Sequence, residues 1–199
     1  MELWLTVNGK TVSASSQLDP LTRAVVISLF THRRADPDDN VDVPMGWWGD
    51  TGIYTRPANL KYALVYVVGA GGGSGSAPAT SSAQTSASPG GASGSWAKVR
   101  LTAAEIGASL PYVVGPGGAA GVNGAGGDGG NTSFGSLIIC PGGKGSVIGI
   151  AISTSSSALI QGAAAGGIPT VSAGIVLESS NGNPGGKSMF VTANTLAGD

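Results

Sequence analysis

Short apolar runs that end in glycine are the dominant pattern of this chain. Tyr62–Val68 is apolar throughout and leads directly into a glycine-rich stretch. The arrangement returns as PYVVGPGGAAG from Pro111 and SLIICPGGKG from Ser136, with a looser repeat in GIVLESSNGNPGG from Gly174. Val, Ile and Tyr favour a buried pleated strand. Gly-Gly and Pro-Gly favour loops, where glycine supplies positive φ angles and close backbone approach. The pattern predicts a β scaffold that presents many glycine-rich loops.

The second part of the chain alternates strands with loops. Residues 96–101 alternate apolar and basic residues, so Lys98 and Arg100 should face water. Residues 102–107 fit one helical turn, with Thr102 as the N-cap and Glu105 completing a capping box. Further strands are predicted at 112–114, 133–140, 147–153, 174–178 and 188–192. Repeated short strands with long glycine-rich loops, the longest at 70–94, indicate a β-sandwich or a barrel-like domain.

The N-terminal part has a different pattern. Leu3, Leu5 and Val7 alternate with polar residues, and the Asn-Gly pair that follows predicts a tight β-hairpin. Asp19-Pro20 fits a helix N-cap, and the spacing of apolar residues in LTRAVVISLF predicts a helix over 21–30. The β-branched VVI in this stretch leaves a strand as the alternative. The N-terminal part is therefore expected to be a small α+β segment.

An acidic loop and two tryptophans follow, in THRRADPDDNVDVPMGWWGD. Alternating carboxylates in DPDDNVD suit a hard cation such as calcium, but the glycine and the distant glutamate of an EF-hand loop are missing. A solvated loop that pairs with Arg33 and Arg34 is favoured, and we predict no metal site. Trp47 and Trp48 fit either a local core or an interface, because tryptophan is enriched at binding hot spots.

Composition divides the chain near residue 52. Residues 1–61 hold six of the ten Lys and Arg, seven of the eleven Asp and Glu, and four of the 35 glycines. We therefore divide the chain into an attachment segment at 1–51 and a glycine-rich β domain at 52–199. A net charge of −1 gives no electrostatic reason to expect nucleic acid as a partner. No signal peptide and no membrane-inserting segment is predicted.

Enzymatic motifs are weak, and we predict neither catalysis nor a cofactor. His32 is the only histidine, and no G-x-S-x-G sequence supports a catalytic triad around it. Cys140 ends an apolar run and fits a small buried side chain. GAGGGSG follows a strand, but no helix pattern comes after it, as a dinucleotide site would require.

The glycine-rich stretches leave three interpretations open. They fit flexible linkers, packed polyglycine-II-like rods with three residues per turn, or loops that recognise a ligand. GGAAGVNGAGGDGGN shows no strict three-residue repeat, which counts against the rods. Loops that expose backbone N–H and C=O groups suit hydroxyl-rich ligands, so receptor binding is the preferred interpretation.

Two family resemblances sharpen these expectations. AVVISLFTHRRADPDD followed by GWWGD resembles, over about residues 19–50, the small baseplate-wedge protein of Mu-like contractile-tailed phages. From residue 52, GIYTRPANLKYALVYVVGAGGGSG resembles the glycine-rich domain at the ends of phage tail fibres and adhesins, and the likeness is good to about residue 145. The first likeness stops short of a complete wedge subunit.

The resemblances imply a virion protein of the phage tail, made in the host cytoplasm. Its N-terminal part would dock onto baseplate wedge proteins, and its glycine-rich domain, as a homotrimer, would contact a host receptor of saccharide or outer-membrane type. The docking residues would be Phe30, Arg33, Arg34, Trp47 and Trp48, and the receptor-binding residues Asn123, Asp128 and Asn131. A purely structural baseplate component is the alternative, and a free glycine-rich binding protein, such as an ice binder, is a third reading.

Replacing Trp47 and Trp48 by alanine should release the protein from assembled particles while residues 52–199 stay folded. A tryptophan at the centre of an interface contributes about 2 kcal/mol or more to binding. The measurement is an immunoblot of purified particles for the double variant. Normal incorporation would mean that the tryptophans fill a local core instead.

Overall fold

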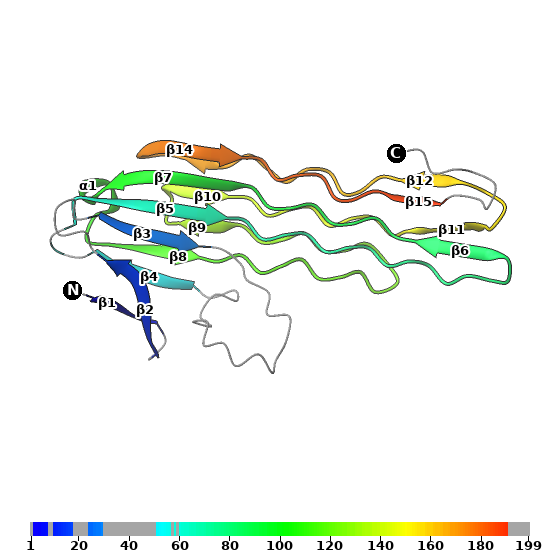
Figure 1. Ribbon diagram of the computed structural model, residues 1–199, viewed down its shortest axis with the longest axis horizontal. Helices are drawn as coiled ribbons and strands as arrows, with labels where there is room; N and C mark the ends of the chain where they lie inside the picture. Colours follow the sequence, from blue (N-terminus) through cyan, green and yellow to red (C-terminus); the bar gives the residue numbers. More distant parts are fainter. Residues whose placement is uncertain are drawn as a thin grey trace.

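The computed structural model describes residues 2–7, 10–17, 24–29, 51–56, 58 and 60–190, with the backbone alone for 2–29. Within these residues the chain is mainly β, as predicted, and its one helix is the single turn α1 (Ala103–Ile106). A β-sandwich forms one end, and long extended segments run from it to two small sheets at the other end (Figure 1).

Strand β5 (Tyr62–Val68) is the centre of the first sheet of the sandwich. Every second residue of β5 is fully buried, as its alternation of exposure shows. The neighbouring strand β7 (Trp96–Thr102) alternates in the same way and pairs with β5 in antiparallel register, Val65 opposite Val99. Both strands were predicted from the sequence. Their alternation sends the same-phase side chains into one core.

The first sheet has the order β14-β7-β5-β3, with β14 (Ile175–Ser180) and β3 (Ala24–Leu29) at its edges. β3 pairs with β5 in parallel, Val26 opposite Leu64. The helix predicted over 21–30 is therefore wrong for residues 24–29, and the strand alternative is confirmed. Its β-branched residues suit a pleated edge strand, and tertiary pairing overrides a helical spacing of only a few apolar residues.

The second sheet has the order β13-β10-β9-β8-β4. Its strands are β13 (Thr170–Val171), β10 (Ile138–Cys140), β9 (Thr132–Phe134), β8 (Ser109–Val113) and β4 (Thr51–Thr55). The single strand predicted at 133–140 is wrong, because β9 and β10 form a hairpin there. The chain turns at Gly135, whose φ of 54° is one that side-chain-bearing residues rarely adopt.

The two sheets enclose the hydrophobic core. Phe134, Ile138 and Cys140 are fully buried and pack with the inward side chains of β5 and β7. The Tyr54 ring lies tilted against Phe134, with 5.6 Å between the ring centres. The predicted β-sandwich is confirmed for this end of the molecule.

The predicted capping box closes the start of α1. The Glu105 carboxylate accepts the Thr102 N–H at 2.6 Å, and the Thr102 hydroxyl oxygen accepts the Glu105 N–H at 3.3 Å. The other carboxylate oxygen accepts the N–H of Gly174 at 3.0 Å. Hydrogen bonds from Thr102 hold the pKa of Glu105 below its ordinary value. One side chain thus caps the helix and fixes the chain before β14.

The far end holds two small sheets. β6 (Gln84–Ala87) pairs with β11 (Ile150–Ser153), and β12 (Ala158–Ile160) pairs with β15 (Ser188–Phe190). β6 lies in the stretch predicted as a 25-residue loop at 70–94, and the strand predicted at 147–153 begins only at Ile150. The N-terminal hairpin is present as the antiparallel pair β1 (Glu2–Val7) and β2 (Lys10–Gln17).

Replacing Phe134 by alanine should lower the free energy of unfolding by about 3–5 kcal/mol, because a fully buried ring leaves a cavity. Urea unfolding followed by circular dichroism measures the change. The control is Ile53→Ala, since Ile53 is 70% exposed and its replacement should cost about 0.5 kcal/mol or less. Equal losses in both variants would contradict the assignment of the core.

Candidate functional site

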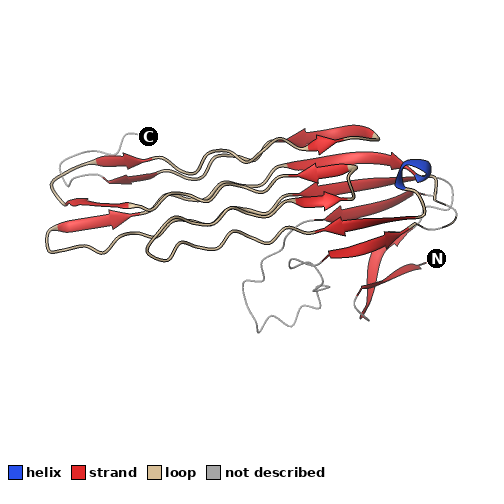
Figure 2. Ribbon diagram, turned by 180° about the vertical axis from the view of Figure 1, so that it is seen from behind, coloured by secondary structure: helices blue, strands red, loops and turns tan. Residues whose placement is uncertain are grey.

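Between the sandwich and the distal sheets the chain runs as extended glycine-rich segments, which we call rods. Figure 2 shows them side by side along the long axis of the molecule. Their residues are 69–83, 88–95, 114–121, 124–131, 141–149, 161–169 and 181–187. The segments 114–121 and 124–131 are the two arms of one hairpin. The shaft of the molecule therefore contains chain that is neither helix nor strand.

Hydrogen bonds join the rods at intervals of three residues. The rod that starts at Gly69 and the returning arm of the hairpin show this plainly, because donors three apart meet acceptors three apart. The bonds are Ala70 N to Gly130 O at 3.1 Å, Gly73 N to Gly127 O at 2.9 Å and Ser76 N to Gly124 O at 2.9 Å. A left-handed extended helix with three residues per turn has this period.

The same rod is bonded on its other sides. Its donors Gly69 and Gly72 reach Ser95 O and Ala92 O in rod 88–95. Its carbonyls at 70, 73 and 76 accept from the N–H groups of 143, 146 and 149. Those at 71 and 74 accept from 118 and 121. Bonding to several neighbours with a three-residue period is the polyglycine-II arrangement, so the structure supports the rod interpretation over flexible linkers.

Glycine is needed in the rods for close approach. An added Cβ at Gly69, Gly72 or Gly75 would lie 2.0–2.2 Å from a carbonyl oxygen of rod 141–149. Among the described glycines, a positive φ occurs at Gly107, Gly135 and Gly174, none of which is in a rod. The expectation that the glycine-rich stretches need positive φ angles is wrong. They need backbones that touch.

The three-residue repeat is present within each rod. In the outgoing arm of the hairpin, Gly115, Gly118 and Gly121 all face the returning arm, and an added Cβ would lie 2.2–2.3 Å from its carbonyls. In the returning arm, Gly126 and Gly129 face rod 69–83. Each reversal of the chain restarts the phase, so the whole stretch shows no strict repeat. Counting the period separately on each side of the turn would have revealed it.

One buried serine takes a glycine position in this lattice. Ser146 lies between Gly143 and Gly149 in the three-residue register and is 1% exposed. Its hydroxyl donates to Pro89 O and accepts from Gly75 N, both at 2.7 Å. The side chain fits because it supplies the hydrogen bonds that a backbone neighbour would otherwise make.

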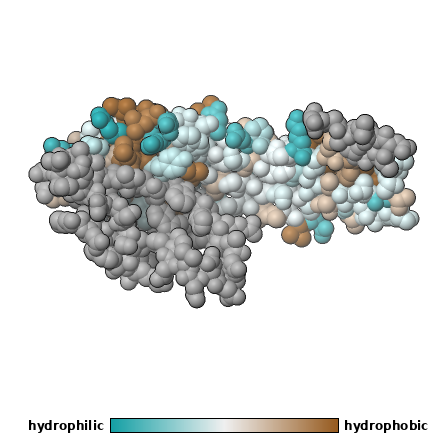
Figure 3. Space-filling view, viewed as in Figure 1, coloured by the Kyte–Doolittle hydropathy of each residue, from teal (hydrophilic) through white to brown (hydrophobic). Residues whose placement is uncertain are grey.

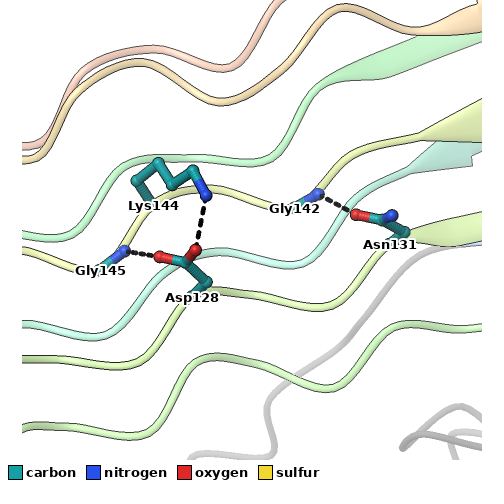
Figure 4. Close-up of polar contacts among 5 residues, drawn as sticks. All are labelled: Asp128, Asn131, Gly142, Lys144 and Gly145. Atoms are coloured by element: carbon teal, nitrogen blue, oxygen red, sulfur yellow. Dashed lines mark hydrogen bonds and ion pairs between the residues drawn. The ribbon is translucent and has the colours of Figure 1, made fainter.

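Two of the three predicted receptor-binding residues join neighbouring rods. Figure 4 shows Asp128 and Asn131, which are three residues apart on the returning arm. The Asn131 side-chain oxygen accepts the N–H of Gly142 at 3.1 Å, and Asp128 accepts that of Gly145 at 2.9 Å. These side chains therefore follow the period of the rods. Their receptor-binding role stays a prediction, beside a structural role that the sequence did not suggest.

Asp128 also pairs with Lys144, at 2.6 Å between carboxylate oxygen and ammonium nitrogen. The Lys144 side chain and then the Gly145 N–H hold the pKa of Asp128 below its ordinary value. Both side chains are more than half exposed, so the pair contributes little to stability. It does cancel the two charges.

The remaining predicted residues lie elsewhere. Asn123 is exposed at the turn of the hairpin with a φ of 53°, which asparagine tolerates well, and lies apart from the Asp128 and Asn131 contacts. The predicted docking residues lie outside the described residues, as do the acidic loop and His32. They are Phe30, Arg33, Arg34, Trp47 and Trp48. Their role stays a prediction.

The distal turns are a surface that the sequence analysis did not single out. Residues 79–84 and 153–157, at the start of β6 and the end of β11, are exposed and rich in serine and threonine. No charged residue occurs from 145 to 177 or from 62 to 97. This absence of charge in two long stretches that meet at β6 and β11 was the available signal.

Chemistry elsewhere in the described part of the chain is sparse. The Cys140 thiol donates to Val67 O at 3.4 Å, and burial raises its pKa to about 11, so it is an unreactive core residue. The described residues contain no cluster of three His, Cys, Asp or Glu suited to a metal ion. Nor do they contain a helix long and apolar enough to span a membrane.

Comparison with known families adds to this geometry. Residues 48–199, which include all the rods, match the glycine-rich domain family. The chain belongs to this family. Residues 21–68 match the family of phage protein GP46. No curated protein matches the chain.

These matches confirm both resemblances. The phage-protein match extends to residue 68, beyond the predicted 19–50, and therefore includes β3 and β5. The two matches overlap at 48–68, and the division of the chain at residues 51 and 52 stays a prediction. Together the matches support a structural protein of a phage and are consistent with a component of the virion.

Replacing Gly118 by alanine should lower the free energy of unfolding by about 1–3 kcal/mol, because the new Cβ would meet Gly127 O at 2.2 Å. The matched control is the neighbouring Gly117→Ala, where nothing lies within 4 Å of the new atom. That change should be neutral or stabilise by up to about 1 kcal/mol. Thermal unfolding of both variants measures the difference, and similar melting temperatures would contradict the lattice.

Proposed function

We propose that this protein is a tail fibre or adhesin subunit of a contractile-tailed phage. Its N-terminal part docks on the baseplate wedge, and its distal end contacts the host surface. The role requires no catalytic step and no cofactor. The observation that carries the proposal is the separation of the two ends by the shaft of rods.

The position of the phage-protein match supports this orientation. The matched residues 21–68 include β3 and β5, both in the sandwich, whereas the distal turns lie at the opposite end of the long axis (Figure 1). A rigid scaffold that holds exposed loops away from its attachment point suits a binding surface. Seven residues of rod at about 3.1 Å each span roughly 22 Å.

Self-association, as a trimer, is part of the same proposal. Edge strand β14 exposes three consecutive apolar side chains, Ile175, Val176 and Leu177, at 54, 46 and 46%. Figure 3 shows an apolar group over this strand. Contiguous exposed apolar residues are typical of protein interfaces.

Replacing residues 79–83 and 154–157 by glycine and serine should reduce adsorption of particles to host cells, while the amount of the protein in the particles stays normal. The turns are exposed, so their replacement should cost the fold less than about 1 kcal/mol. The measurement is the rate at which free particles disappear from a suspension of host cells. Unchanged adsorption with normal incorporation would favour the alternative, a purely structural baseplate component.

A further inference from the structure

The glycines of rod 141–149 stop where its neighbour stops. Gly142 and Gly145 face the returning arm of the hairpin, and an added Cβ at either would lie 2.1 Å from the carbonyls of Gly129 and Gly126. The next residue in this three-residue register is Ile148, one of the largest side chains in the rods. A branched side chain fits there because the hairpin turns at residues 122–123.

The end of the hairpin leaves a step on the side of the shaft. Figure 1 shows the turn of the hairpin well short of the distal sheets, and the reverse view agrees (Figure 2). The N–H of Gly126 bonds Ser146 O, so antiparallel register brings residues 122–124 level with residues 148–150. Beyond the turn, this face of rod 141–149 has no neighbouring arm.

Three apolar side chains surround this step. Val122 is 88% exposed, Val147 61% and Ile148 43%. Val147 follows Lys144 by three residues, and Lys144 reaches across to Asp128 on the same arm of the hairpin. Val147 therefore emerges on the face that borders the hairpin. We call Val122, Val147 and Ile148 the apolar step, and Figure 3 shows an apolar group at the corresponding edge of the shaft.

The surroundings of the apolar step carry no unbalanced charge. Between residues 106 and 177 the charged residues are Asp128 and Lys144, which pair with each other. Lys187 is also distal, but rod 181–187 bonds to rods 88–95 and 161–169, as in the Gly90 N to Gly186 O and Gly185 N to Ala163 O bonds. It thus lies across rod 88–95 from the hairpin. A charged ligand at the step would lose hydration and gain no ion pair.

We propose that the apolar step binds an uncharged apolar segment of a protein on the host surface. This proposal rests on the proposed function and names the partner chemistry of the distal end. Aliphatic side chains exposed at more than 40% regain the free energy of burial only against an apolar surface. Because no ion pairs form, the binding does not depend on ionic strength.

The test compares Ile148→Ser and Val122→Ser with the control Ile168→Ser in the full-length protein on phage particles. Ile168 is also an isoleucine on a rod and is 70% exposed, but its rod leads into β13 of the sandwich. Adsorption of the two step variants should fall about tenfold or more, the loss expected for an interface centre. The control should adsorb like the unchanged protein.

Three further measurements accompany the adsorption rates. Adsorption of unchanged particles should vary less than about twofold between about 50 and about 500 mM NaCl, where screening changes strongly. Protease treatment of the host cells should abolish adsorption. Melting temperatures and light scattering of the purified variants should match those of the unchanged protein.

Several results would overturn the proposal. They are normal adsorption of both step variants, a steep fall of adsorption with salt, and undiminished adsorption to protease-treated cells, which would indicate a saccharide. A change of oligomeric state in the step variants would assign the step to contacts between copies. If replacing the distal turns reduces adsorption and changing the step does not, this inference alone fails. If neither does, the proposed function fails as well.

Discussion

Direct contact between backbones is the constraint on which the shaft depends. The rods lie so close that a single methyl group at most inward positions would meet a carbonyl oxygen at about 2 Å. At that spacing the N–H and C=O groups of one rod reach those of several others. Backbone hydrogen bonds hold the shaft together where other proteins use an apolar core, and glycine is the residue that permits this.

The ends of the molecule complete what the rods cannot provide. The sandwich buries the apolar core, and its strands β5, β8, β10 and β14 continue into rods, so strand register sets rod register. At the distal end Ile160 and Phe190 are 8% exposed and close the shaft with a small apolar cluster. An array of glycine segments without side chains to specify alignment is thereby aligned from both ends.

The sequence predicts the parts of the fold that carry side-chain patterns. β5, β7 and the Thr102–Glu105 capping box follow from alternation and local hydrogen bonding, which neighbouring residues determine. The rods depend on which segments lie side by side, and no pattern within 115–131 reveals that the phase restarts at the turn. Asp128 and Asn131 were taken for ligand contacts because polar side chains are rare there, yet they bond Gly145 and Gly142. The helix expected at 21–30 fails because pairing of β3 with β5 decides its structure.

The direction of the hydrogen bonds determines how the shaft bears mechanical load. The rods run along the long axis (Figure 1), and their bonds, such as Gly73 N to Gly127 O, connect rods across it. Tension between the two ends would therefore load many bonds in shear at once, whereas a sideways pull would open them one after another. Forced unfolding is governed by the rate of opening. The shaft should accordingly resist a pull along its axis far better than a pull that peels one rod away.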